Sequence, residues 1–188
     1  MMDNIAKYIY EVGQLKRVKR SGWWIVGVDN PESVAEHTFR TAIIGYLLAA
    51  LAGADPFRVC TICVFHDIHE TRINDLHLIS KQYLESQQEH RILQEQVKEL
   101  PQDISLQILS LFPDNSNNAQ LQLEVELAHD ADLLECMIQA IEYKTLGYKE
   151  AEDWIINCQS RLKNPFSLKL AESCLRTPPS SWWKELNK

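Results

Sequence analysis

One stretch decides the fold, VCTICVFHDIHE at residues 59–70. Val59 to Phe65 are almost all apolar, and His66 and Asp67 follow them directly. Neither an imidazole nor a carboxylate has an apolar role, and both are ligands that divalent metals accept. Two residues of types that bind metals therefore follow each other where an apolar helix is expected to end. A histidine–aspartate pair is common by chance, so its meaning depends on what surrounds it.

Composition describes an ordinary soluble globular protein. The chain has 188 residues, of which 45% are hydrophobic and 24% charged, which predicts one domain over residues 1–188 with a sizeable core. The net charge of -7 argues against a binder of DNA, RNA or membrane surfaces. No apolar run is long enough to cross a membrane, and the N-terminal stretch lacks the apolar segment of a signal peptide. We therefore expect a cytoplasmic protein.

Two local clusters have open interpretations. The basic residues of segment 16–20 could steer a phosphate or could be solvated. Cys60 and Cys63 form a C-x-x-C within an apolar helical pattern, and no second such pair accompanies them. Core packing explains these two thiols better than metal binding does. The odd number of cysteines, five in all, is typical of reduced thiols.

Apolar positions recur mostly at spacings of three and four, which predicts an all-α fold. Ser33 and Glu36 form a capping-box pattern, and Asp55 followed by Pro56 is a second helix start. A short extended stretch is allowed at residues 23–28, a loop at 69–80 and a surface turn at 115–118. Gly147 is placed to end the longest helix. Helices are expected over residues 4–15, 33–51, 56–66, 80–100, 103–111, 119–145, 149–162 and 165–175.

Four side chains from separate helices could hold a divalent ion. His37 lies one turn into its helix, His66 and Asp67 end another, and Asp132 lies within a third. Three helices could enclose such a site in the core of a bundle. Each residue also has a plainer interpretation, because His37 could be a cap or a core residue. Asp132 and its neighbour Asp130 could likewise lie on an exposed face.

Six blocks resemble one family in their residues and their order. The blocks are LKRVKRSGW (15–23), NPESVAEH (30–37), FHDIHE (65–70), INDL (73–76), AHDAD (128–132) and QAIEY (139–143). They are similar to the motifs of the HD-domain 5′-deoxynucleotidase family, over roughly residues 5–145. The resemblance implies an all-α HD-domain helical bundle with a metal site in its core, on which the helices of residues 149–188 would pack.

The resemblance also implies the ligands of a single divalent ion: His37, His66, Asp67 and Asp132. Asp130 is the rival in the last block, and Asp132 is preferred because it takes the fifth position of the family's segment. Mn²⁺, Co²⁺, Zn²⁺, Fe²⁺, Ni²⁺ and Mg²⁺ are not distinguished by these ligands.

Catalytic and substrate-binding roles follow from the same resemblance. Glu70 would transfer a proton, and Asp75 would lie near the leaving ribose oxygen or orient water. Arg20 offers a planar fork for phosphate. Trp23 could wall the sugar pocket, where its ring would disfavour a 2′-hydroxyl, or it could be a plain core tryptophan. Without the family, Glu70 could be a solvated helix-end residue and Asp75 a turn residue.

The expected reaction is hydrolysis of deoxynucleoside 5′-monophosphates to nucleoside and phosphate, by a metal-dependent phosphomonoesterase. The resemblance suggests a homodimer, and the Trp182-Trp183 pair in the tail could pack across its interface. One alternative is another HD phosphohydrolase, acting on a cyclic dinucleotide, a nucleoside triphosphate or an alarmone. Two-metal members need additional histidines, and His69, His77 and His90 are spare ones. The other is a non-catalytic metal-binding helical dimer. Base preference and the physiological metal stay open.

Overall fold

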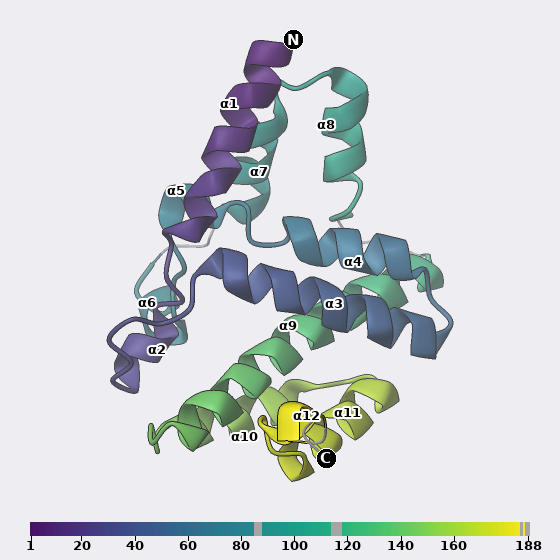
Figure 1. Ribbon diagram of the computed structural model, residues 1–188. Coiled ribbons are helices and arrows are strands. Elements are labelled where there is room, and N and C mark those ends of the chain that lie inside the picture. The colour runs from purple at the N-terminus through teal and green to yellow at the C-terminus, as the bar shows by residue number, and fades with distance from the viewer. Residues whose placement is uncertain (85–87, 114–117, 185, 187–188) are drawn as a thin grey trace.

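A computed structural model describes residues 1–84, 88–113, 118–184 and 186 (Figure 1). These residues form helices joined by turns and contain no strand, apart from one isolated bridge between Lys19 and Ser33, which confirms the all-α prediction. The helices are α1 (Met2–Val12), the 3-10 helix η1 (Gly13–Lys16), α2 (Gly22–Ile25), α3 (Val34–Ala52), α4 (Pro56–Phe65), α5 (Glu70–Ile73), α6 (Leu78–Lys81), α7 (Glu89–Val97), α8 (Gln102–Leu109), α9 (Ala119–Thr145), α10 (Ala151–Arg161), α11 (Pro165–Arg176) and α12 (Ser181–Lys184).

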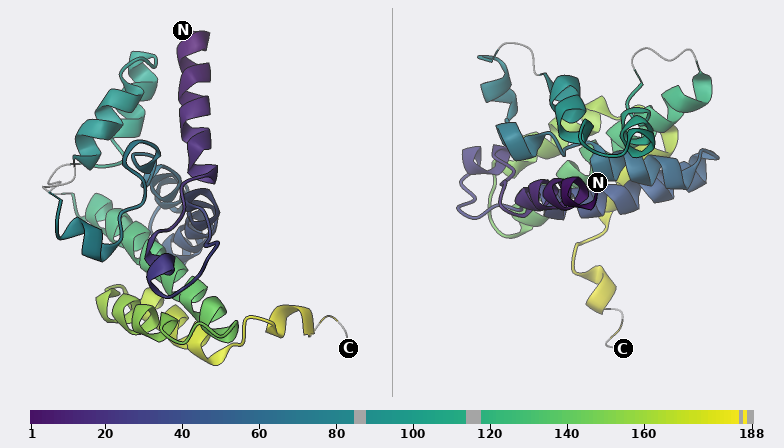
Figure 2. Two further views of the ribbon diagram at one scale, coloured as in Figure 1. Left: turned by 90° about the vertical axis from the view of Figure 1, so that its left-hand side faces the viewer. Right: turned by 90° about the horizontal axis from the view of Figure 1, so that it is seen from above.

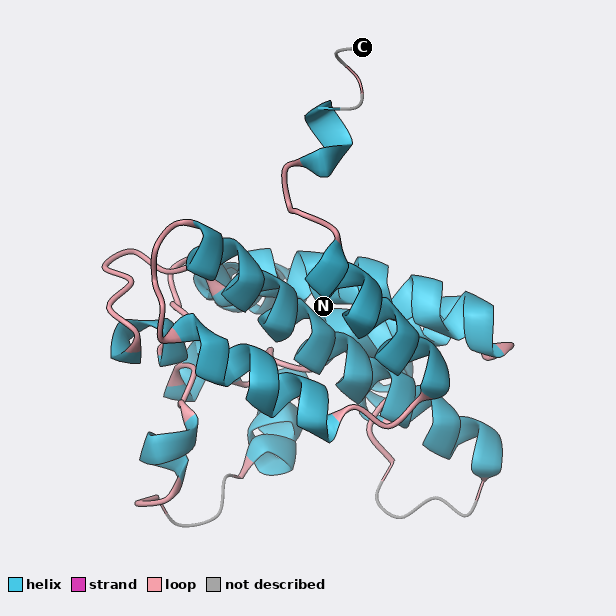
Figure 3. Cartoon of the chain, turned by 90° about the horizontal axis from the view of Figure 1, so that it is seen from below, coloured by secondary structure: helices cyan, strands magenta, loops and turns pink. Residues whose placement is uncertain are grey.

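Helices α3, α4 and α9 pack against one another at the centre of the molecule. Helices α10 and α11 pack on α9, while α1, α7 and α8 stand at the other end (Figures 1 and 2). The main core lies between α3, α4, α9 and α10, where Leu48, Leu127, Leu134 and Met137 are fully buried. Seen from below, α12 projects away from the body at the end of the chain (Figure 3). The centre of the fold is therefore a three-helix crossing.

The predicted caps begin the two helices that lead into this crossing. At the start of α3, the Ser33 amide donates to the Glu36 carboxylate at 2.6 Å, and the Glu36 amide donates to Ser33 Oγ at 3.3 Å. At the start of α4, Asp55 accepts hydrogen bonds from the first-turn amides, and Pro56 takes the first helical position. Both caps satisfy amides that would otherwise lack partners.

The long helix α9 begins and ends as its sequence predicts. Asn118 caps its first turn through its side-chain oxygen, and Gly147 follows its last residues with a φ of 109°. That left-handed conformation is easy only for glycine. The length of α9 carries it past α3, α4, α10 and α11, so it is the element on which the other core helices pack.

Two local predictions are wrong. Residues 23–28 are not extended, because residues 22–25 form the single helical turn α2 and residues 26–27 a turn. Packing of Trp23 against Tyr143 and Trp154 decides this conformation, since tertiary contacts override β-propensity. The predicted helix over residues 80–100 is also absent as one element, because α6 ends at Lys81 and α7 begins at Glu89.

The loop predicted at residues 69–80 contains two single helical turns, α5 and α6. His77 caps α6 by accepting a hydrogen bond from the Ser80 amide at 3.2 Å. Of the turn predicted at residues 115–118, residues 115–117 lie outside the described residues. No helix in the described part of the chain is long and apolar enough to span a membrane.

Close packing of α3 on α4 depends on Gly45. A Cβ at this position would lie 2.7 Å from Cys63 Sγ and 3.2 Å from Val59 Cγ1. Cys63 is buried in the core, Cys60 packs against it, and both thiols are free. The C-x-x-C pair therefore packs in the core, as the sequence favours.

We predict that Gly45→Ala destabilises the protein by about 1–3 kcal/mol, because the added methyl overpacks a close helix crossing. Thermal or urea unfolding measures the change. Gly13→Ala is the matched control, since Gly13 has a φ of −59° and open space around its Cβ position. Its expected effect is between zero and about 1 kcal/mol of stabilisation. Equal stability of the two variants would contradict this account of the crossing.

Candidate metal centre

The three central helices bring all four predicted ligands together. His37 comes from the first turns of α3, His66 and Asp67 directly follow α4, and Asp132 comes from the middle of α9. The ligand atoms of His37, His66 and Asp132 lie within 4.8 Å of one another. Asp67 Oδ2 lies 3.0 Å from His66 Nε2 and 3.7 Å from His37 Nε2. Asp132 Oδ1 lies 3.0 Å from His37 Nε2.

Both imidazoles are oriented through their other nitrogen. His66 Nδ1 donates to the carbonyl oxygen of Cys63 at 2.5 Å, and His37 Nδ1 pairs with the buried carboxylate of Glu135. With Nδ1 as the donor in each ring, Nε2 faces the two aspartates and can present a lone pair to a metal once it has lost its proton. Metal-binding histidines are commonly held in this way by a carbonyl or a carboxylate.

Glu135 and Arg40 are two residues of the candidate site that sequence reasoning missed. Arg40 Nε donates to Glu135 Oε1 at 2.9 Å, and the same guanidinium reaches Glu142 at 2.8 Å. This ion pair holds the carboxylate that orients His37. A signal existed, because Glu135 follows Asp132 by three residues and Arg40 follows His37 by three. Both are spacings that bring side chains onto one helix face.

The chemistry of the donor set fits a divalent cation. His66 Nε2 and Asp67 Oδ2 are buried and lie 3.0 Å from each other, and neither has another hydrogen-bond partner among the described residues. Burial disfavours the protonated form of His37, but Glu135 and Asp132 outweigh it and raise the pKa of His37 to about 10. Burial likewise opposes charge on Asp67 and Asp132, yet the imidazoles hold the pKa of each carboxyl well below its usual range. The cluster therefore attracts positive charge.

Asp130 has a different environment from Asp132. Its carboxylate is fully buried and accepts hydrogen bonds from the backbone amides of Lys163, at 3.2 Å, and Asn164, at 2.8 Å. These amides lie in the link between α10 and α11, so Asp130 ties that link to α9. The rival ligand is thus occupied away from the imidazoles, whereas Asp132 faces them.

Arg20 lies at the edge of the cluster. Its guanidinium is 3.3 Å from Asp75 Oδ1, 3.9 Å from Asp67 Oδ2 and 4.0 Å from Asp132 Oδ1. Asp75 is itself anchored, because its Oδ2 accepts a hydrogen bond from the Ser21 amide at 2.6 Å. Asp75 therefore positions Arg20 beside the candidate metal ligands.

A cavity of about 360 Å³ opens beside these residues, and Arg20, Asp75 and Asp132 line it. Trp23 lines it too, although its side chain is almost fully buried. The indole Nε1 donates to Glu32 at 3.0 Å, and the ring packs edge-on against Tyr143. Trp23 is therefore both a core residue and a rigid part of the cavity wall.

Glu70 is buried at the first position of α5, close along the chain to Asp67. Its Oε2 atom has no hydrogen-bond partner in the described part of the chain. Burial raises the pKa of Glu70 to about 9, and the carboxylates of Asp67 and Asp75 add to the effect. At neutral pH this carboxyl holds its proton in the metal-free protein.

Two of the spare histidines, His69 and His77, have partners outside the four-residue cluster. His69 Nδ1 hydrogen-bonds to the backbone carbonyl of His66 at 3.1 Å, and its Nε2 lies 3.7 Å from Glu89. The imidazole of His77 caps α6. Neither belongs to a group of potential metal ligands among the described residues.

With this geometry in view, a family model described as HD domain matches residues 12–172. The chain belongs to the HD domain family. It is 27% identical over 173 residues to the 5′-deoxynucleotidase HDDC2 of Bos taurus, covering 89% of this chain and 82% of that protein. It is 30% identical over 155 residues to the 5′-deoxynucleotidase HDDC2 of Dictyostelium discoideum, covering 76% and 79%. The family resemblance inferred from the six sequence blocks is thereby confirmed.

Solved structures of this fold agree. A conserved hypothetical protein from Pyrococcus furiosus matches with a TM-score of 0.71 and 32% sequence identity, over 92% of this chain and 99% of that one. A predicted metal-dependent phosphohydrolase from Magnetospirillum magnetotacticum matches with a TM-score of 0.61 at 18% identity, which shows the shared fold alone. The HD-domain helical fold predicted from the sequence is thus confirmed.

We predict that Asp132→Asn lowers the content of bound divalent metal, because it removes a carboxylate that faces both imidazoles. Asp130→Asn should keep its metal and lose stability instead, since it weakens the hydrogen bonds to the α10–α11 link. Elemental analysis after dialysis, with a thermal melt of each variant, measures the two effects. Loss of metal in Asp130→Asn with metal retained in Asp132→Asn would reverse the assignment.

Proposed function

We propose that this protein hydrolyses deoxynucleoside 5′-monophosphates to deoxynucleoside and phosphate with the help of one divalent metal ion. The observation that carries the proposal is the convergence of two imidazoles and two carboxylates beside Arg20, at a cavity of about 360 Å³. Cavities of this size hold small molecules. The relatives named 5′-deoxynucleotidase support the same substrate class.

The residues that would hold the ion are His37, His66, Asp67 and Asp132. Two neutral imidazoles and two carboxylates balance a divalent charge, and such a set suits several first-row ions and Mg²⁺. When bound, the ion supplies a Lewis acid for a phosphate oxygen and lowers the pKa of a water molecule. Glu135 and the Cys63 carbonyl act outside this set by orienting the two imidazoles.

Arg20 would bind the phosphate of the substrate. Its guanidinium presents a planar fork of donors, which matches two phosphate oxygens better than an ammonium does. Asp75 holds the guanidinium of Arg20 within 4.0 Å of Asp132 and 3.9 Å of Asp67. A phosphate bound there would therefore lie against the candidate ligands, with Asp75 close to the leaving ribose oxygen.

Glu70 would transfer the proton that the leaving oxygen needs. A general acid must hold a proton near neutral pH and release it in the transition state. In the metal-free protein, burial raises the pKa of Glu70 to about 9, and its Oε2 atom has no hydrogen-bond partner among the described residues. The rigid ring of Trp23 would form one wall of the sugar pocket and exclude a 2′-hydroxyl.

The cytoplasmic location and the homodimer stay predictions from the sequence.

We predict that the Mn²⁺- or Co²⁺-loaded protein releases phosphate from deoxynucleoside 5′-monophosphates faster than from the matching ribonucleotides. The physical reason is the fixed Trp23 ring in the cavity wall. Phosphate release from both series, together with a cyclic dinucleotide, a nucleoside triphosphate and an alarmone, measures the preference. Turnover of a diester or triphosphate with no release from any 5′-monophosphate would refute the proposed substrate class.

We predict that Glu70→Gln lowers kcat by about 10²–10⁴-fold, the usual contribution of a positioned general acid or base. Metal content should stay at the wild-type level, because Glu70 is outside the set of candidate ligands. Steady-state kinetics and elemental analysis give the two readouts. Glu99→Gln is the matched control, since Glu99 is exposed and distant in sequence from the cluster. Full activity in Glu70→Gln would remove Glu70 from the mechanism.

A further inference from the structure

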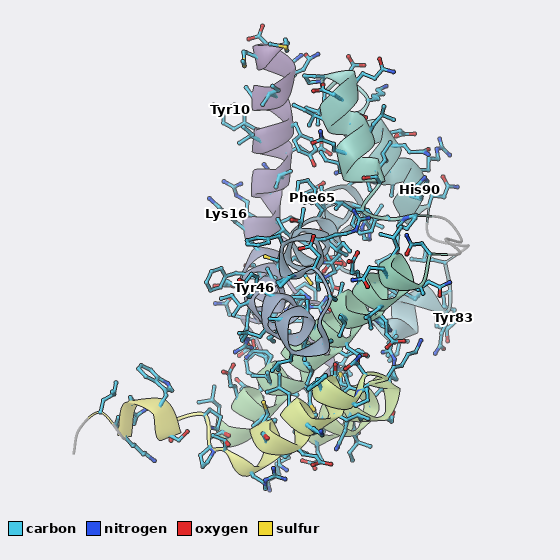
Figure 4. The ribbon with its side chains drawn as sticks, turned by 90° about the vertical axis from the view of Figure 1, so that its right-hand side faces the viewer. Tyr10, Lys16, Tyr46, Phe65, Tyr83 and His90 are labelled. Atoms are coloured by element: carbon cyan, nitrogen blue, oxygen red, sulfur yellow. The ribbon has the colours of Figure 1, made fainter. Side chains whose placement is uncertain are left out.

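Two cysteines on neighbouring helices line the cavity beside Asp132. Cys136 lies on α9 and Cys158 on α10, and both belong to the cavity wall. Helix α10 packs along α9 at the end of the body that lies opposite α1 (Figure 4). The two positions are far apart along the chain and follow no cysteine motif. The fold alone therefore brings these two thiols into one wall.

The two thiols are in contact with each other. The Cys136 thiol donates a hydrogen bond to the sulfur of Cys158, and this bond holds the pKa of Cys158 below its ordinary value. Burial and Asp132 oppose the ionisation of Cys158, whereas Arg161 and Arg20 favour it. Both cysteines are free. Two free thiols in contact at a cavity wall are the starting arrangement of an oxidisable pair.

The C-x-x-C pair, Cys60 and Cys63, has a different environment. Cys63 is buried in the core, and this burial raises the pKa of its thiol well above the ordinary value. Neither Cys60 nor Cys63 is among the described residues that line the cavity. A thiol buried among apolar groups stays protonated and inert, whereas a thiol in a cavity wall can meet small reagents. The environment thus favours oxidation at Cys136 and Cys158 over oxidation at the pair with the sequence motif.

We propose that Cys136 and Cys158 form a disulfide when the protein meets hydrogen peroxide, and that this bond reversibly lowers the activity of the site. A cavity of about 360 Å³ admits a molecule as small as peroxide. In reducing compartments, disulfides are mostly transient and serve as redox sensors. The lowered activity rests on the proposed function, whereas the disulfide does not.

The reaction balances in two steps. The Cys158 thiolate attacks one peroxide oxygen, the O–O bond breaks, and the departing hydroxide takes up the proton that the Cys158 thiol had released. The Cys136 sulfur then attacks the sulfur of the Cys158 sulfenic acid, so that an S–S bond forms and the S–O bond breaks. The second hydroxide leaves as water with the proton of the Cys136 thiol. Two thiols are thereby oxidised to one disulfide, and one peroxide is reduced to two waters.

A disulfide at this place would move groups that the site uses. It brings its two sulfurs to about 2 Å, closer than a hydrogen bond between thiols. Cys136 follows Asp132 by four residues on α9, so both lie on one face of that helix. A close-packed wall transmits such a pull to its neighbours, and a misplacement of about 1 Å in a site can cost about 10²-fold in rate. The oxidised protein should therefore turn over its substrate more slowly.

Intact mass and thiol titration after denaturation test the disulfide itself. Peroxide should remove two of the five thiols of the full-length, Mg²⁺-loaded protein, and a protease digest should contain the peptide of Cys136 linked to that of Cys158. Cys136→Ala should keep its thiols under the same treatment. Cys174→Ala is the matched control, because Cys174 lies on α11 outside the cavity wall, and it should form the linked peptide. Linkage of another pair, or thiols that resist peroxide, would overturn the proposal.

Phosphate release from a deoxynucleoside 5′-monophosphate tests the effect on the site. Circular dichroism establishes that each variant is folded, and Cys158→Ala replaces Cys136→Ala if the latter does not fold. Peroxide should lower turnover at least about tenfold, and dithiothreitol should restore it, in the wild type and in Cys174→Ala but not in Cys136→Ala. Equal turnover of the reduced and the linked protein would overturn the control of activity. A linked protein without hydrolysis in either state would refute the proposed function, and the control of activity with it, but not the disulfide.

Discussion

Charge balance around the buried His37 is the constraint on which the rest of the structure depends. Its ring has no exposed surface and lies between the carboxylates of Glu135 and Asp132. Burying unpaired charges costs several kcal/mol for each ion, so α9 must supply both carboxylates at one height along α3. Arg40 then balances Glu135 from the outer side.

The same balance explains why the cluster is incomplete as a purely structural device. Arg40 and His37 compensate Glu135. Among the described residues, Asp67 and Asp132 pair with the two imidazoles and, at 3.9 and 4.0 Å, with Arg20, for which Asp75 competes at 3.3 Å. A structural cluster would pair each buried charge at shorter range. His66 Nε2 and Asp67 Oδ2 lie 3.0 Å from each other and have no other hydrogen-bond partner among the described residues. A divalent ion would take the place of the positive charge that protonated His37 supplies in the metal-free protein.

The sequence predicts what depends on local chemistry and on ordered motifs. The caps at Ser33 and Asp55 are local, and the structure has both. The four candidate ligands were found because their order along the chain matches a family. Glu135 was missed because its role depends on His37, which lies 98 positions away. The turn at Trp23 was missed because a distant aromatic cluster, and not local propensity, sets its conformation.

Helix α3 shows a second limit of sequence reasoning. Its apolar residues recur on all sides, and the pattern alone does not separate positions buried in the core from positions buried by a partner. The structure separates them, because His37 and Leu48 face inward while Phe39 and Leu47 face solvent. An exposed apolar surface costs solubility unless something covers it. One helix thus carries a candidate metal ligand on its buried side and large apolar side chains on its exposed side.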